Sequence, residues 1–206
     1  MPEIVAGVIL AGGRSRRMGG DNKALLEIGG QNLLARTVAA ARPQVGALVL
    51  SANSEQVAAA CPDLPAVADS VPDFAGPLAG ILAGFEWAGE HVPGCRLLAG
   101  FAVDAPLFPP DLVARLAAAL DQGAEMACAV SGGRRHPVFG LWPVALAGEL
   151  RRAVVEQGVR RIEAWTGRYR TAMVEWPVTP LDPFHNVNTP EDLALLRALL
   201  AEGIII

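Results

Sequence analysis

The sequence predicts an α/β fold with a mainly parallel central sheet and helices on both of its faces. Short apolar runs alternate along the chain with stretches of helical periodicity, and this alternation is typical of parallel sheets. Glycines or polar residues directly follow several of the apolar runs, at the positions where such sheets bind their ligands. The length of 206 residues suits a single domain spanning 1–206.

The expected strands are short, buried apolar segments bounded by Gly, Pro, Ser, Asn or Asp. In chain order they are 4–10, 47–50, 66–68, 96–103, 126–130, 138–142 and 172–176. The last part of the chain is less regular than the first, and a turn over 131–136 is expected to join two of its strands.

The expected helices follow these strands and carry recognisable start and stop signals. They are 32–41, a short helix from about 54, 77–87, 111–120, one that carries Arg151 and Arg152, one that follows Arg161, and a C-terminal helix after Thr189. Pro77 and Pro190 occupy first helical positions, where proline is favourable. Thr189 is expected to cap the last helix, and Gly203 to follow its end.

The loop after the first strand has the chemistry of an anion site. Gly12 and Gly13 end the apolar run, and glycines let backbone N–H groups approach a ligand closely. Three arginines (14, 16 and 17) and Lys23 follow within ten residues. Because these cations repel one another unless an anion lies among them, the loop predicts a triphosphate site.

Glycine-rich turns and solvated arginine clusters are also common without any function. The chain has neither a P-loop sequence nor a G-x-G-x-x-G dinucleotide turn. One fact favours function: Lys23 is the only lysine, beside sixteen arginines. A position that keeps lysine in such a chain is expected to need a compact, mobile ammonium and not a planar guanidinium.

Polar side chains follow three further strands. Ser51 and Asn53, then Asp69, and then Asp104 come at predicted carboxyl ends, so we expect them to converge with Gly12 at one edge of the sheet. Asp104 can either cap the turn that follows or bind Mg²⁺, which needs only one or two carboxylates besides substrate phosphates. Asp69 can likewise cap its own loop.

Composition excludes several classes of protein. The net charge of −4 argues against a nucleic-acid or anionic-membrane partner. Three widely spaced cysteines without a C-x-x-C pair indicate neither a disulfide framework nor a zinc site. The N-terminus carries Glu3 and no basic segment, so no signal peptide is predicted and a cytoplasmic location is expected.

Four motifs carry a resemblance to a known family. They are LAGG-x-S-x-R-M-G with a following D-x-K at 10–23, GPLAG at 76–80, VDAPLFPPDL at 103–112 and NVNTPEDL at 186–193. Together they resemble molybdenum cofactor guanylyltransferases over nearly the whole chain. The resemblance implies a Rossmann-like three-layer nucleotidyltransferase fold and transfer of GMP from GTP to the terminal phosphate of molybdopterin, with release of pyrophosphate. That phosphate is already anionic, so no general base is expected.

The resemblance also implies roles for individual residues. Lys23, Arg17 and Asp104 are implied to be catalytic, and Asp104 to bind Mg²⁺. The residues implied to bind GTP are Leu10, Ala11, Gly12, Gly13, Lys23, Ser51, Asn53, Asp69, Gly76, Pro77, Leu78 and Asp104. The residues implied to bind molybdopterin are Arg134, His136, Asn186 and Asn188. Ser51 stands where the family often has asparagine.

Other functions remain open at this stage. Cytidylyltransferases of the same group usually begin with T-A-A-G, whereas this chain reads Leu-Ala-Gly-Gly at 10–13, which favours guanine. Sugar-phosphate and methylerythritol nucleotidyltransferases share the expected fold and are further alternatives. The non-enzymatic alternative is a regulatory module that binds nucleotide without catalysis. Besides the small-molecule substrates, transient contact with cofactor-insertion proteins or molybdoenzymes is expected.

Overall fold

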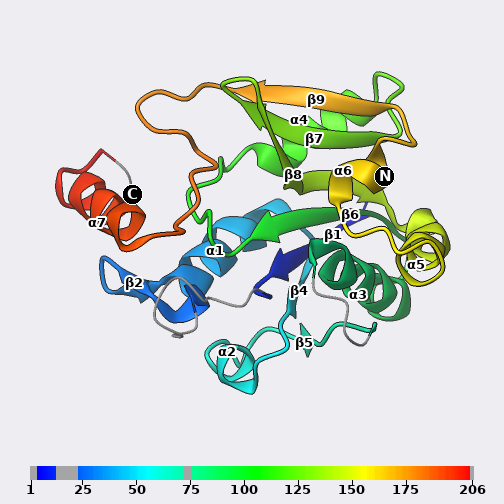
Figure 1. Cartoon of the computed structure of the whole chain (residues 1–206), viewed down its shortest axis with the longest axis horizontal. Helices are drawn as coiled ribbons and strands as arrows, with labels where there is room; N and C mark the ends of the chain where they lie inside the picture. Colours follow the sequence, from blue (N-terminus) through cyan, green and yellow to red (C-terminus); the bar gives the residue numbers. More distant parts are fainter. Residues whose placement is uncertain (1–3, 13–22, 72–75, 205–206) are drawn as a thin grey trace.

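A seven-stranded sheet runs through the centre of the protein (Figure 1). The computed structural model describes residues 4–12, 23–71 and 76–204. Within them the strand order is β5-β4-β1-β6-β8-β7-β9. The strands are β1 (Ile4–Leu10), β4 (Ala47–Ser51), β5 (Ala66–Val67), β6 (Cys95–Ala102), β7 (Met126–Ser131), β8 (Arg134–Pro143) and β9 (Thr171–Trp176).

Only β8 runs against the other six strands. It pairs antiparallel with β6 and β7, whereas the β1–β4, β1–β6, β4–β5 and β7–β9 pairs are parallel. The predicted mainly parallel α/β sheet is therefore confirmed. Because all parallel strands end at one edge, the sheet has a single carboxyl edge, which lies at the left in Figure 1.

Helices cover both faces and enclose two separate cores, so the fold has three layers. The helices are α1 (Leu33–Ala41), α2 (Glu55–Ala59), α3 (Pro77–His91), α4 (Leu112–Leu120), α5 (Ala147–Val155), α6 (Ile162–Thr166) and α7 (Pro190–Ala201). Buried side chains of α1, α4 and α7 belong to one core, and those of α3, α5 and α6 to the other. Strand β1 serves both: Val8 packs in the second core and Ile9 in the first, as alternation along a strand requires.

The hairpin β7–β8 differs from its predicted form. The turn consists of Gly132 and Gly133 alone, with φ of 53° and 74°, and positive φ at both central residues permits the tightest hairpin turns. Arg134 and His136, which the sequence placed in a longer turn, therefore belong to β8. Helix α3 is also longer than predicted, and ends at His91 instead of about 87.

A small hairpin, β2 (Glu27–Ile28) with β3 (Gln31–Asn32), was not predicted. Helix α7 packs against it: the Arg197 guanidinium donates to the carbonyl oxygen of Glu27, and a Cβ on Gly29 would lie 2.1 Å from Leu200. This contact brings the last helix back to the segment that follows Lys23. Within the described residues, no helix has both the length and the apolar character needed to cross a membrane.

Candidate active site

The carboxyl edge of the sheet brings together the predicted strand-end residues. Leu10 and Ser51 end their strands, while Asp69 and Asp104 each lie two residues beyond the strand before them. Backbone bonds tie these ends together, since the Ala11 N–H donates to the Ser51 carbonyl and the Val103 N–H to that of Leu10. We call these strand ends, with the segments that follow them, the carboxyl rim.

Asn53 and Asp69 form one pair on this rim. The Asn53 side-chain amide donates to Asp69 Oδ2 over 2.8 Å, and its Oδ1 accepts from the Asp69 backbone N–H over 2.9 Å. Both residues keep solvent access. The pair therefore presents polar groups at the end of β5 that a ligand can reach.

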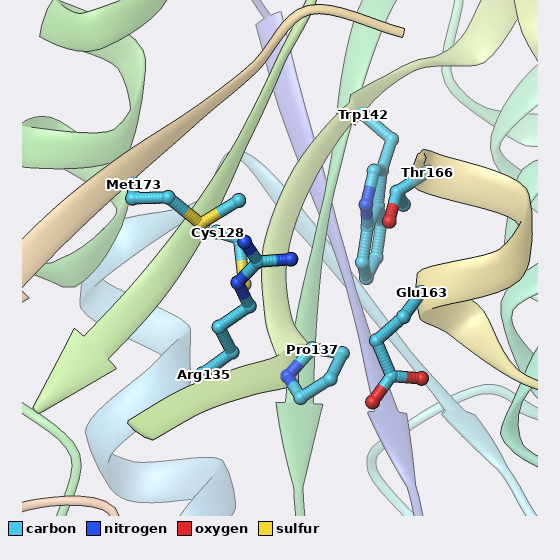
Figure 2. Close-up of a pocket in the computed structure, with 7 residues that line it drawn as sticks. All are labelled: Cys128, Arg135, Pro137, Trp142, Glu163, Thr166 and Met173. Atoms are coloured by element: carbon cyan, nitrogen blue, oxygen red, sulfur yellow. The ribbon is translucent and has the colours of Figure 1, made fainter. Parts of the chain in front are cut away.

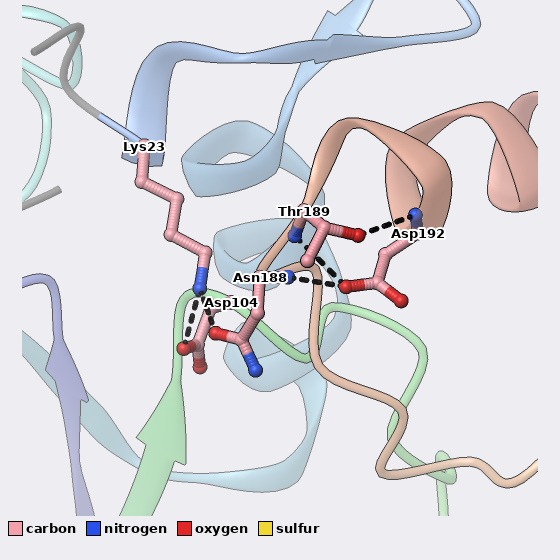
Figure 3. A network of polar contacts seen from close by, with 5 residues as sticks. All are labelled: Lys23, Asp104, Asn188, Thr189 and Asp192. Atoms are coloured by element: carbon pink, nitrogen blue, oxygen red, sulfur yellow. Dashed lines mark hydrogen bonds and ion pairs between the residues drawn. The ribbon is translucent and has the colours of Figure 1, made fainter. Parts of the chain in front are cut away.

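Lys23 and Asp104 form the second pair (Figure 3). The Lys23 ammonium donates to Asp104 Oδ2 at 2.9 Å and to Asn188 Oδ1 at 2.7 Å. The lysine side chain is only 16% exposed, and that of Asp104 is 33% exposed. Three predicted site residues, separated by up to 165 positions in sequence, thus meet around one ammonium.

No described residue crowds Gly12. A Cβ added there would meet no atom of the described residues within 4 Å, so none of their side chains requires glycine at this position. Gly13 and Arg17, together with the other arginines of the predicted triphosphate loop, lie outside the described residues.

Three other predicted nucleotide residues occupy or surround the start of α3. Gly76 precedes the helix and Pro77 begins it, while Leu78 is fully buried in the core. Ser51 is only 2% exposed, and a Cβ on Gly80 of α3 would lie 2.7 Å from its hydroxyl. In this conformation the Ser51 hydroxyl faces α3 and not the open rim.

The predicted molybdopterin residues fall into two places. Arg134 is exposed at the start of β8, and Asn188 reaches Lys23, with Asn186 two residues before it. His136 is buried: its Nε2 lies 2.6 Å from the Ser131 hydroxyl, which donates to Asp182 Oδ1 at 2.8 Å.

The His136 ring stacks on Phe184 with 4.6 Å between ring centroids. Burial lowers the pKa of His136 below its ordinary value, and this effect outweighs the opposing charge of Asp182. The imidazole is therefore neutral at pH 7. Since the hydroxyl meets both the imidazole and the carboxylate, the three groups are not ordered as in a Ser-His-Asp triad, where the histidine lies in the middle.

A separate pocket lies between the strands β7, β8 and β9 and the helix α6 (Figure 2). Its lining residues are Cys128, Arg135, Pro137, Trp142, Glu163, Thr166 and Met173. Burial raises the pKa of the Cys128 thiol to about 11, so the thiol stays protonated and is not a nucleophile at neutral pH. None of the predicted site residues that the structure describes lines this pocket.

The metal chemistry open to the rim is limited. Among the described residues, no group of three or more His, Cys, Asp or Glu side chains could hold an ion. One carboxylate, such as that of Asp104, is chemically sufficient for a hard cation that takes its other ligands from phosphates and water. Its partial exposure leaves room for such a cation to approach.

Comparison with known proteins establishes the family. Residues 7–171 match the family described as the MobA-like NTP transferase domain. The chain belongs to this family. MobA-like NTP transferases are nucleotidyltransferases, so the protein is an enzyme of that class and the predicted family is confirmed.

A relative agrees with this membership, and two solved structures have the same fold. A molybdenum cofactor guanylyltransferase of Rhodopseudomonas palustris is 50% identical over 96% of this chain and 93% of its own length. The crystal structure of molybdopterin-guanine dinucleotide biosynthesis protein A from Archaeoglobus fulgidus superimposes with a TM-score of 0.74 at 23% identity, over 96% of this chain and 99% of that one. A Mycobacterium tuberculosis protein, crystallised with manganese, has a TM-score of 0.66 at 19% identity, over 95% and 98%.

The sequence did not reveal what holds the site residues in place. Asp192 accepts hydrogen bonds from the backbone N–H groups of Asn188 and Thr189, and so fixes the segment that reaches Lys23. The spacing Thr189-x-x-Asp192 is a capping-box signature and signals a helix start. Nothing in that spacing indicates that the preceding residue would meet a lysine from the other end of the chain.

Proposed function

We propose that the protein transfers GMP from GTP to the terminal phosphate of molybdopterin, releasing pyrophosphate and forming the guanine dinucleotide cofactor. The observation that carries the proposal is the Lys23–Asp104 pair on the carboxyl rim of a chain that belongs to the NTP transferases. The name of the 50% identical relative favours guanine and molybdopterin over other substrates.

The proposed reaction is an in-line displacement. An oxygen of the molybdopterin phosphate attacks the α-phosphorus of GTP, a new P–O–P bond forms, and the bond to the β-phosphate breaks as pyrophosphate leaves. Because the attacking phosphate is already anionic, the reaction requires positioning and charge neutralisation more than proton transfer.

The rim residues divide these tasks. The backbone of 10–13 and the start of α3 at 76–78 would hold the nucleotide, with Asn53 and Asp69 on its nucleoside side. Ser51, whose carbonyl oxygen accepts from the Ala11 N–H, would support the 10–13 backbone. Lys23 would contact the phosphates during transfer, assisted by Arg17. Arg134, Asn186 and Asn188 would lie on the molybdopterin side of the rim, and His136, which is buried, would support that side without contacting the ligand.

Asp104 would bind Mg²⁺ together with the triphosphate, and the cation would supply charge neutralisation at the phosphates. In the structure Asp104 is paired with Lys23, so a cation on this carboxylate requires the pair to loosen when the nucleotide binds. The triphosphate offers the ammonium new acceptors at that moment.

One experiment tests the substrate assignment. The protein is incubated with molybdopterin and Mg²⁺ plus either GTP or CTP, and dinucleotide and pyrophosphate are measured by chromatography and mass spectrometry. Product should form with GTP, and GTP with Mg²⁺ should raise the Tm whereas CTP should not. Equal product from CTP, or equal stabilisation by both nucleotides, would contradict the guanylyl assignment.

A further inference from the structure

The Lys23 ammonium is held between two acceptors that belong to distant parts of the chain. Asp104 follows β6 in the centre of the sheet, whereas Asn188 lies just before α7. The two bonds, of 2.9 Å and 2.7 Å, fix the ammonium from two sides. The position of Lys23 therefore depends on where the backbone places Asn188.

That backbone is fixed at two neighbouring residues. The Val187 N–H donates to the Asp104 carbonyl at 2.7 Å. The Asn188 N–H donates to Asp192 Oδ2 at 2.8 Å. Asp192 thus provides the attachment nearest to the Asn188 side chain (Figure 3).

Asp192 does more than complete a capping box. The box needs only the reciprocal bonds between Thr189 and Asp192, which are both present. The bond from Asn188 N–H is additional, because Asn188 precedes the cap. It is also the largest cause that lowers the pKa of Asp192 below its ordinary value. The other carboxylate oxygen of Asp192, Oδ1, lies 3.3 Å from His185 Nε2, but the two atoms do not have hydrogen-bond geometry.

We propose that Asp192 is a positioning residue for nucleotidyl transfer: it fixes Asn188 so that the amide oxygen holds the Lys23 ammonium beside Asp104. This inference rests on the proposed function for its effect on turnover. Asp192 lies in the first turn of α7. The last helix would thus contribute to the active site from the opposite end of the chain to Lys23.

The two halves of the capping box provide a matched pair of variants. Asp192→Ala removes the bonds from both Asn188 N–H and Thr189 N–H, whereas Thr189→Ala removes only the bond from Asp192 N–H to the hydroxyl. Each loses helix capping, so each should lower the Tm by roughly 2–4 °C. Only Asp192→Ala frees Asn188.

The expected effect on the reaction separates positioning from capping. Asp192→Ala should lower kcat about tenfold while leaving GTP affinity within about twofold. The positive charge of Lys23 is kept in this variant, but the alignment of its ammonium is lost. Thr189→Ala should keep the wild-type kcat. Asp192→Glu should restore most of the rate, because Glu is the usual residue at this position of a capping box. Equal kcat in Asp192→Ala and Thr189→Ala would overturn the proposal.

A second measurement does not depend on any activity. Since Lys23 is the only lysine, its acetylation by acetic anhydride can be followed by peptide mass spectrometry and separated from that of the N-terminus. The rate should rise several-fold in Asp192→Ala and stay unchanged in Thr189→Ala. Asp192→Asn, which keeps the shape of the side chain, should give an intermediate rate and serves if the alanine variant does not fold.

The two proposals fail in distinguishable ways. A wild-type protein that forms no dinucleotide from GTP would contradict the proposed function, and the labelling rates would still test the position of Lys23. Equal labelling of Asp192→Ala and Thr189→Ala would overturn the role of Asp192, whatever nucleotide the enzyme uses.

Discussion

The two halves of the carboxyl rim differ in how far their polar networks are exposed to solvent. On the half formed by β5, β4, β1 and β6, the pairs Asn53–Asp69 and Lys23–Asp104 keep access to solvent. On the half formed by β8, β7 and β9, Ser131 and His136 are buried among aromatic rings and satisfy one another with Asp182.

This difference indicates two roles. A partly exposed pair can exchange one partner for a ligand at modest cost, because water or the ligand replaces the lost bond. A buried network cannot, since each unsatisfied group would pay its full desolvation penalty. We therefore expect chemistry on the first half, while the second half holds the segment from Asp182 to Asn188 in place.

The largest expected effect is that of Asp104→Asn. The amide keeps the shape of the side chain but loses the charge that binds a hard cation, so turnover should fall more than about 10³-fold. The Tm should change little, because the side chain is one-third exposed. Turnover near wild type at ordinary Mg²⁺ concentrations would show that Asp104 is not the metal ligand.

Lys23→Arg should have the next largest effect. The lysine ammonium fits between Asp104 and Asn188 as a single point, whereas a guanidinium is wider and spreads its charge over a plane. Turnover should fall about 10²–10³-fold, while GTP affinity falls only modestly because the positive charge remains. Single-turnover rates and GTP binding measured side by side test this expectation, and near-normal turnover would contradict it.

The smallest effect concerns His136 and the pH dependence of stability. Its pKa in the folded protein lies below the ordinary value of 6.5, so the unfolded chain binds the proton more tightly. The stability contributed by neutral His136 is therefore complete above about pH 6.5 and is lost as the pH falls from there toward the folded-state pKa. Urea unfolding of the wild type between pH 5 and 8 should show this loss.

A pair of histidine variants isolates that contribution. His136→Gln should remove part of the destabilisation seen on going below pH 6.5, whereas His91→Gln should retain it because the His91 side chain is 56% exposed. The Ser131 hydroxyl contacts the His136 ring, and the charges of Asp182, Arg134 and Glu175 also act on its pKa. An unchanged pH profile in His136→Gln would show that His136 is not the group whose protonation lowers the stability.

The sequence by itself determined the features that depend on near neighbours. The bounds of β1 are those predicted, and the C-terminal helix begins at Pro190 after its Thr189 cap. Gly203 follows its end with φ of 68°. Apolar runs, proline at a first helical position and glycine past a helix end act within a few residues, so a linear pattern contains the information. The strand-end positions of Asp69 and Asp104 followed from the same patterns.

Only the tertiary structure decided which of those residues meet. Lys23 and Asp104 are 81 positions apart, and Lys23 and Asn188 are 165 apart. The segment that carries Asn188 leads into α7, which packs back onto the β2–β3 hairpin through Arg197 and Leu200. His136 likewise lies in a buried strand and not in the predicted loop, because the turn consists of Gly132 and Gly133 alone. Such contacts result from the packing of whole elements, which the pattern of any one segment does not contain.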